Sequence, residues 1–185
     1  MRTIAVSLAL SLPLLVSGCS NGVSHLSSID SPAAGSYRLG PGDDLRLAVF
    51  GFDQMANVYT VADNGTISLP LLGTIKADQR TPAELEAAIS SQLLSRELAT
   101  KPSVSVQVVK YRPIYILGEV QKPGQYPYVP GMTVTTAVAI AGGYTFRAST
   151  KAAAVTRSGT DVERRASVVT RIMPGDTIRV PEAWF

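Results

Sequence analysis

The chain has few of the residue types that catalysis and disulfide cross-linking need. It has 1 cysteine, 1 histidine and 1 tryptophan among 185 residues. A single cysteine excludes a disulfide within one chain. The only histidine, His25, has no second histidine and no free cysteine to join it, which argues against a Ser-His-Asp triad and against a zinc site. We therefore expect no enzyme activity, no catalytic residues, no metal and no cofactor.

The chain also lacks a strong excess of charge and, beyond its first residues, a long apolar run. Its formal net charge is only +3, which gives no reason to expect a nucleic-acid partner. A membrane-spanning helix needs about 20 largely apolar residues, and no such segment follows residue 18. We therefore expect no spanning helix in the processed protein.

The N-terminus has the pattern of a secretion signal. Arg2 precedes an apolar run from Ile4 to Val16, which is too short to cross a bilayer comfortably. The run leads into Leu15-Val-Ser-Gly-Cys19. This ending resembles a bacterial lipobox, which implies removal of residues 1–18 and acylation of Cys19. The alternative is an ordinary signal peptide with an incidental cysteine.

The residues after Cys19 predict a flexible tether and the membrane in which the protein is anchored. Residues 19–36 are rich in Ser, Gly, Ala and Pro without periodicity, so we expect them to be flexible. By resemblance to lipoprotein sorting, Ser20 in place of an aspartate implies the outer membrane. The expected location is therefore a lipid anchor in the outer membrane with the protein facing the periplasm.

One turn motif occurs at both ends of the folded region. Gly40-Pro41-Gly42-Asp43 precedes a strand in which Leu45, Leu47 and Val49 share one face, and Pro174-Gly175-Asp176 precedes a similar alternation. The prolines fix one backbone angle, and the glycines are free to take a positive φ. Asp43 and Asp44 are adjacent, so their side chains diverge and cannot form a catalytic carboxylate pair. We interpret both copies as structural turns.

Further segments predict the elements between these turns. Asp63-Asn-Gly65 predicts a hairpin joining residues 58–61 to 66–69. Thr81-Pro-Ala-Glu84 is a capping box that predicts a helix with Leu85, Ile89 and Leu93 on its apolar stripe, ended by Lys101-Pro102. Residues 104–108 predict a strand. In the second half we expect strands at 114–117, 153–156 and 178–180, and a helix over 133–141 capped by Gly142-Gly143.

The order of these segments resembles a known family. Residues 39–43, 63–75, 81–85 and 102–108 resemble the N-terminal export domain of the outer-membrane polysaccharide export family. Residues 116–126 and Ala139-Ile-Ala-Gly-Gly-Tyr144 resemble its soluble-ligand-binding β-grasp (SLBB) domain. The resemblance implies an α+β fold, with an export domain of β-hairpins and one helix over residues 37–110 and an SLBB domain over residues 111–185.

The resemblance also implies a function and partners. We expect a lipid-anchored periplasmic subunit that forms a homo-oligomeric collar and conducts an exopolysaccharide or capsular polysaccharide to the outer membrane. The implied partners are the polymer, an inner-membrane polysaccharide copolymerase and a separate outer-membrane β-barrel. Larger family members carry a C-terminal membrane helix that we do not find before Phe185, so we expect membrane attachment through lipid alone, with Trp184 and Phe185 packed or at an interface.

A second hypothesis is a periplasmic glycan-binding lipoprotein without a transport role. Tyr126 and Tyr128 lie on one face of an extended segment and could stack on sugar rings. The alternative is that they cap a sheet edge among Pro123, Pro127 and Pro130. Ligand-binding residues therefore stay unassigned.

Overall fold

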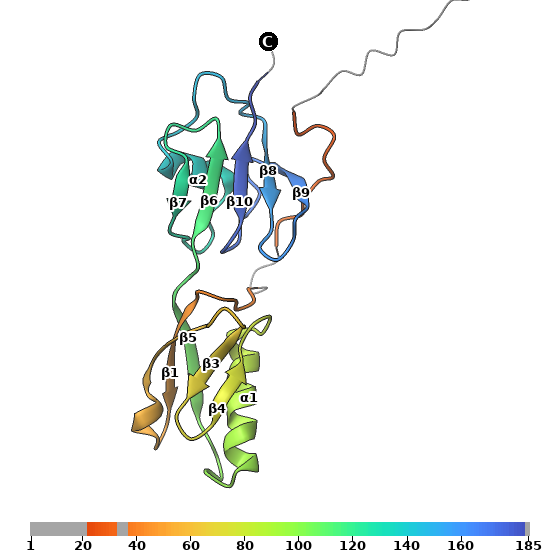
Figure 1. The fold of residues 1–185 in the computed structure, drawn as a ribbon. Coiled ribbons are helices and arrows are strands. Elements are labelled where there is room, and N and C mark those ends of the chain that lie inside the picture. The colour runs from red at the N-terminus through yellow and green to blue at the C-terminus, as the bar shows by residue number, and fades with distance from the viewer. Residues whose placement is uncertain (1–21, 33–36, 184–185) are drawn as a thin grey trace, which may run out of the picture.

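The computed structural model describes residues 22–32 and 37–183, which form an α+β fold, as the sequence predicts (Figure 1). Two separate hydrophobic clusters make up most of the core, one among residues 39–106 and one among residues 114–180. Residues 1–18, which the sequence predicts to be a signal peptide, and Cys19, Trp184 and Phe185 lie outside the described residues. Within those residues, no helix has both the length and the apolar character that crossing a membrane requires.

The first unit consists of two small sheets and one long helix. A three-stranded antiparallel sheet has the order β2 (Asn57–Thr60), β1 (Asp44–Val49), β5 (Val104–Lys110), and the turn η1 (Asp53–Met55) connects β1 to β2. A two-stranded sheet pairs β3 (Thr66–Leu69) with β4 (Gly73–Lys76). The alternation in β1 buries Leu45, Leu47 and Val49, as predicted.

The predicted hairpin across Asp63-Asn-Gly65 is wrong. The turn itself forms, since the Ala62 amide donates to the Thr66 carbonyl at 2.9 Å, but β2 pairs with β1 and β3 pairs with β4. The Gly65 carbonyl accepts the amides of Ala77 and Asp78, which follow β4. The turn is thus held by a segment distant in sequence, and it passes the chain from one sheet to the other instead of closing a hairpin.

Helix α1 (Pro82–Ser95) begins as the capping box predicts and ends earlier than expected. The Thr81 side chain accepts the Glu84 amide, the Glu84 carboxylate accepts the Thr81 amide, and Pro82 is at the first helical position. The predicted stop at Lys101-Pro102 is wrong. Glu97 adopts φ 58°, and the amides of Glu97 and Leu98 donate to the carbonyls of Leu94 and Leu93, a Schellman ending formed without glycine.

The second unit is a five-stranded mixed sheet with a short helix on one face. The strand order is β7 (Gly124–Tyr126), β6 (Ile114–Gly118), β10 (Thr177–Val180), β8 (Ala152–Thr156), β9 (Glu163–Ser167), and only β6 and β10 are parallel. Helix α2 (Val134–Ile140) buries Val134, Ala137 and Val138 in the second core cluster. The strands β7 and β9 are not predicted from the sequence, because Gly124–Tyr126 is very short and Glu163–Ser167 is mostly polar.

Gly142 and Gly143 end α2, as predicted. Their φ angles are 87° and 90°, and their amides donate to the carbonyls of Ala139 and Val138. These are the two bonds of a Schellman motif, with Gly142 in the left-handed position. The glycine pair is therefore a helix cap.

Residues 22–32, the described part of the predicted tether, contact the second unit. The Ile29 amide donates to the Arg165 carbonyl, and the Arg165 amide donates to the Ser27 carbonyl, both at 2.8 Å. Val23 is buried against Ala152 and Ala154 of β8. Residues 22–32 therefore cross the β8–β9 side of the second sheet (Figure 1), and the prediction of a flexible tether is wrong for them. We call residues 22–32 the N-terminal strap.

Candidate functional site at the junction of the two units

The two Pro-Gly-Asp motifs form the same turn. In the Asp43 turn (residues 40–43) and the Asp176 turn (residues 173–176), the amide of the aspartate donates to the carbonyl three residues earlier, at 3.2 and 3.1 Å. Gly42 has φ 88° and Gly175 has φ 82°. Proline followed by a positive-φ glycine is the arrangement of a type II turn. The strands β1 and β10 begin directly after these turns.

Each aspartate also closes its own turn through its side chain. Asp43 Oδ2 accepts the Gly40 amide at 2.8 Å, and Asp176 Oδ2 accepts the Met173 amide at 2.7 Å. Both aspartates are fully buried. A buried carboxylate needs a cationic partner as well as hydrogen bonds. Asp43 is paired with Arg112 and Asp176 is paired with Arg157.

Arg112 connects the two turns. Its main-chain amide donates to Asp43 Oδ1 at 2.9 Å, and its Nη1 donates to Asp43 Oδ2 at 3.1 Å. Its Nε donates to the carbonyl of Pro174 in the Asp176 turn, also at 3.1 Å. The planar guanidinium, with donors in fixed directions, can make both side-chain contacts at once. One side chain therefore links the first strand of the first unit to the last strand of the second.

Glycines in both turns make room for this arginine. A Cβ atom added to Gly40 would lie 2.3 Å from Arg112 Nη1, and one added to Gly175 would lie 2.8 Å from Arg112 Nε. Both distances are far below van der Waals contact, and the arginine is held by its hydrogen bonds. Besides forming the turns, the two glycines therefore leave space for the Arg112 side chain. Arg112 lies between the two motifs in the sequence.

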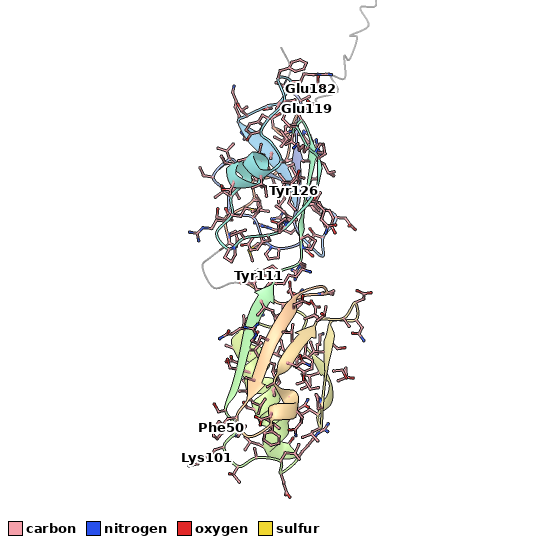
Figure 2. The ribbon with its side chains drawn as sticks, turned by 90° about the vertical axis from the view of Figure 1, so that its left-hand side faces the viewer. Phe50, Lys101, Tyr111, Glu119, Tyr126 and Glu182 are labelled. Carbon is pink, nitrogen blue, oxygen red and sulfur yellow. The ribbon has the colours of Figure 1, made fainter. Side chains whose placement is uncertain are left out.

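Aromatic side chains pack around the same point. The Tyr37 hydroxyl donates to Asp43 Oδ2. Burial and the neighbouring Asp43 carboxylate raise the pKa of Tyr37 above its ordinary value, so its hydroxyl stays protonated. The Tyr111 ring makes edge-to-face contacts with Tyr37 and with Tyr128, at centroid distances of 5.1 and 5.3 Å. Tyr111 lies between the two units in Figure 2, so these contacts also join them.

The protonation state of the buried Asp176 carboxyl group changes with pH near neutrality. Burial outweighs the ion pair with Arg157 and the Met173 amide, and raises the pKa of Asp176 to about 6. Its Oδ1 is buried and has no hydrogen-bond partner among the described residues. Proton uptake there relieves the cost of a poorly solvated charge.

The carboxylates at the junction are engaged in structural contacts. Its carboxylates are buried and paired with arginines, and Asp44, next to Asp43, instead accepts the Thr60 hydroxyl at 2.6 Å. The two adjacent carboxylates therefore point to different partners, as the sequence predicts. Both turns are predictable from the sequence, whereas the contacts of Arg112, Arg157 and Tyr37 are not. In the sequence, Arg112 is distinguished only by its position before Pro113.

A groove beside the junction contains the tyrosines considered for sugar binding. Tyr126 and Tyr128 line it together with Tyr111, Gln125 and Lys110. Tyr126 belongs to β7, an edge strand of the second sheet, and its hydroxyl donates to the Lys122 carbonyl at 2.6 Å. The position at a sheet edge agrees with the capping alternative, and the groove leaves the sugar-stacking alternative open.

This two-unit architecture, with a β-grasp-like sheet following a small export-type unit, agrees with what comparison with known families finds. The family model described as polysaccharide biosynthesis/export protein matches residues 31–109, and the SLBB domain model matches residues 113–173. Together the two matches cover most of the chain. The protein belongs to the polysaccharide biosynthesis and export family.

Individual relatives carry matching names. The chain is 35% identical over 174 residues to the exopolysaccharide production protein ExoF of Rhizobium meliloti, covering 80% of this chain and 41% of that protein. It is 36% identical over 112 residues to the EPS I polysaccharide export outer membrane protein EpsA of Ralstonia nicotianae, covering 58% of this chain and 28% of EpsA. The chain thus spans well under half the length of these relatives.

Proposed function

We propose that this protein is a lipid-anchored periplasmic subunit of an exopolysaccharide export machine and has no catalytic activity. The observation that carries the proposal is the presence of both family domains in one chain, held together at the Arg112 junction. We expect a subunit that assembles in many copies to keep its two domains in a fixed relation. The junction supports such a role because Arg112 bonds to the Asp43 turn and to the Asp176 turn at once.

We further propose that several copies form a collar and that an inner-membrane polysaccharide copolymerase is a partner. Exposed apolar side chains support assembly. Tyr115 and Leu117 of β6 are 43% and 46% exposed on the sheet face opposite α2. Native mass spectrometry of the purified protein tests for the collar, and pull-down from cells tests for the copolymerase. A monomer at all concentrations would contradict the collar.

The export role is tested by deleting the gene and measuring surface polymer and cell-retained polymer separately. Export predicts loss of surface polymer, with polymer retained in the cell or with synthesis stopped while monosaccharide metabolism stays intact. A glycan-binding lipoprotein without a transport role predicts an unchanged surface. Complementation with the parent chain must restore the surface polymer.

The anchor is tested in the same strain with two variants. Cys19→Ala removes the acylated side chain and is expected to restore no surface polymer. By resemblance to lipoprotein sorting, Ser20→Asp should leave Cys19 acylated but hold the protein at the inner membrane. Mass spectrometry of the mature N-terminus checks the modification directly, and an unmodified Cys19 in the parent would contradict the anchor.

A further inference from the structure

One end of the second unit gathers three chain segments far from the first unit. They are the loop 145–151, the C-terminal residues 181–183 and the start of the N-terminal strap at residues 22–24. The Ser149 amide donates to the Pro181 carbonyl, and the Ala183 amide donates to the Arg147 carbonyl, at 2.8 and 2.7 Å. Figure 2 shows Glu182 at one extreme of the molecule and Phe50 at the other. We call these three segments the distal end.

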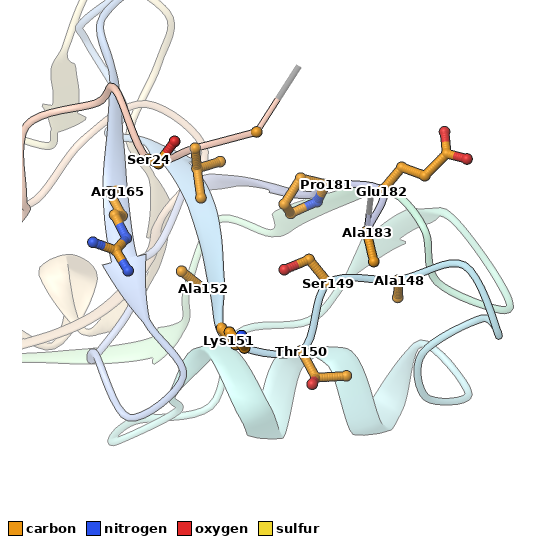
Figure 3. Close-up of a pocket in the computed structure, with 12 residues that line it drawn as sticks. Ser24, Ala148, Ser149, Thr150, Lys151, Ala152, Arg165, Pro181, Glu182 and Ala183 are labelled. Atoms are coloured by element: carbon orange, nitrogen blue, oxygen red, sulfur yellow. The ribbon is translucent and has the colours of Figure 1, made fainter. Parts of the chain in front are cut away.

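A pocket opens in the distal end, between the strap and the loop (Figure 3). Two cationic side chains line it, Lys151 and Arg165. Ser24, Ser149 and Thr150, which carry hydroxyl groups, also line it. Cations surrounded by hydroxyl donors are the groups that bind phosphate oxygens.

The two cations of this pocket are in no ion pair within the described part of the chain, although Asp30 lines a neighbouring pocket that both also border. Glu182 lines the pocket too, but it is paired with Arg147. Among the described residues, neither Lys151 nor Arg165 forms an ion pair with a carboxylate. Lys and Arg outnumber Asp and Glu nine to five over residues 111–183, whereas they are outnumbered seven to eight over residues 37–110. The excess positive charge thus lies in the second unit.

An exposed aromatic side chain lies next to the pocket. Phe146 is at the tip of a turn closed by the bond from the Ala148 amide to the Thr145 carbonyl, and it is 90% exposed. Ala148, two residues later, lines the pocket. A phenylalanine exposed beside cationic side chains is typical of surfaces that bind at the membrane interface.

We propose that the distal end lies on the membrane surface, with Lys151 and Arg165 binding the phosphate of an anionic phospholipid headgroup and Phe146 entering the interface. This inference rests on the Cys19 anchor of the proposed function. Only two residues, Ser20 and Asn21, separate Cys19 from Gly22, a span of about 11 Å at most. A lipid on Cys19 therefore brings the pocket to the headgroups, which favours phospholipid over a free acidic polymer. Each cation near an anionic leaflet adds to the attraction.

The test compares two tryptophan reporters in the acylated full-length mature protein. Phe146→Trp places the reporter in the distal end, and Phe50→Trp places it at the opposite end, where Phe50 is 87% exposed. Both are made in a Trp184→Phe background. The protein is reconstituted into phosphatidylcholine vesicles with and without phosphatidylglycerol, using brominated acyl chains as quenchers. We expect quenching of Trp emission at position 146, increased by phosphatidylglycerol, and little quenching at position 50.

Charge-matched variants assign the effect to the pocket. Lys151→Gln with Arg165→Gln should reduce quenching at position 146 to the level seen at position 50. Arg164→Gln with Arg171→Gln removes the same charge outside the pocket and should retain the quenching. Equal quenching at both reporters, or no loss in the Lys151 and Arg165 variant, would overturn the proposal.

Mass spectrometry of Cys19 in the same samples shows whether a negative result concerns the headgroup site or the lipid anchor. An acylated Cys19 without quenching at position 146 would refute the headgroup site and leave the anchor intact. A chain without acyl groups that is still quenched at position 146 would support the headgroup site and refute the anchor.

Discussion

Single residues decide how the two turns are built. The Gly42 and Gly175 positions look alike in sequence and share a positive φ, yet their surroundings differ. A Cβ at Gly42 would meet nothing closer than 3.7 Å, whereas a Cβ at Gly175 would lie within 3 Å of Arg112 and Ser158. Backbone strain and steric conflict can therefore be separated at these two sites.

We predict that Gly42→Ala costs about 1 kcal/mol in the free energy of unfolding, from backbone strain alone. Gly175→Ala should cost clearly more, because the new methyl group must displace Arg112. Gly51→Ala is the control, since Gly51 has φ 80° and open space around its Cβ position. Chemical denaturation measures all three. Equal losses for the Gly175 and Gly51 variants would contradict the steric role.

Asp176 makes the stability of the protein depend on pH. Its pKa is raised from 3.8 to about 6, so the folded state binds this proton more tightly than the unfolded state does. The stabilisation is complete below about pH 4 and is lost as pH rises through about 6. The free energy of unfolding of the parent, minus that of Asp176→Asn, should fall by up to about 3 kcal/mol between pH 4 and pH 7.

Glu163 provides a control of opposite sign. Its hydrogen bonds from Arg179 lower the pKa of Glu163, so its contribution to stability is present at neutral pH and is lost in acid. The difference between the parent and Glu163→Gln should therefore rise with pH. Denaturant titrations at a series of pH values check both slopes. A flat difference for Asp176→Asn would show that its carboxyl titrates normally.

At the scale of elements, the sequence predicts correctly those helix ends and strands that are determined by residues close together in the chain. The capping box at Thr81, the Schellman glycines after α2 and the alternation of β1 each depend on residues close in sequence, and all three predictions are confirmed. One prediction fails for a local reason, since the Schellman ending of α1 has Glu97 in place of glycine. Two other features that the sequence does not predict depend on distant partners. The polar strand β9 is ordered by β8 and by the strap, and the turn at Gly65 is held by residues beyond β4.

The difference between local and long-range contacts also explains which features of the junction can be predicted from the sequence. The repeated Pro-Gly-Asp pattern identifies both turns, because the turn type depends on four consecutive residues. Nothing in the pattern shows that the turns meet. Their contact depends on Arg112, whose partners Asp43 and Pro174 are 69 and 62 residues away.

Val23 is the most buried residue of the N-terminal strap, and Leu26 and Ile29 are partly buried against the same unit. Val23 is 6% exposed and packs against Ala152 and Ala154. We predict that Val23→Ser increases hydrogen exchange at the amides of Ile29 and Arg165, about tenfold, because the strap opens without global unfolding. Val162→Ser is the control, since Val162 is 59% exposed. Unchanged exchange at both amides would show that the strap does not depend on the Val23 contact.

At the scale of the whole molecule, the junction determines how the two units are oriented. Three groups of contacts cross it: the Arg112 bonds to Asp43 and Pro174, the Tyr111 stacking with Tyr37 and Tyr128, and the continuous chain from β5 to β6. Arg112 is the only one of these that joins both turns through its side chain. Its loss would also leave Asp43 buried with a missing cationic partner, which is strongly destabilising.

We predict that Arg112→Ala broadens the distribution of distances between the two ends of the molecule. Spin labels on Phe50→Cys and Phe146→Cys report this distance, because both sites are highly exposed and lie in different units. An acylated Cys19 does not react with the label. Arg179→Ala is the matched control, since it breaks an ion pair with Glu163 inside one sheet. It should leave the distance distribution narrow.

The Arg112→Ala variant also tests whether a rigid junction is needed for export. If a fixed orientation of the two units is needed for a collar that conducts polymer, Arg112→Ala should lower surface polymer even in cells where the protein is present at parental levels. Arg112→Lys keeps the charge but loses the planar fork, so it should be only partly active. A broadened distance distribution with full surface polymer would show that export does not require a rigid junction. A narrow distribution in Arg112→Ala would instead place the rigidity in the Tyr111 contacts.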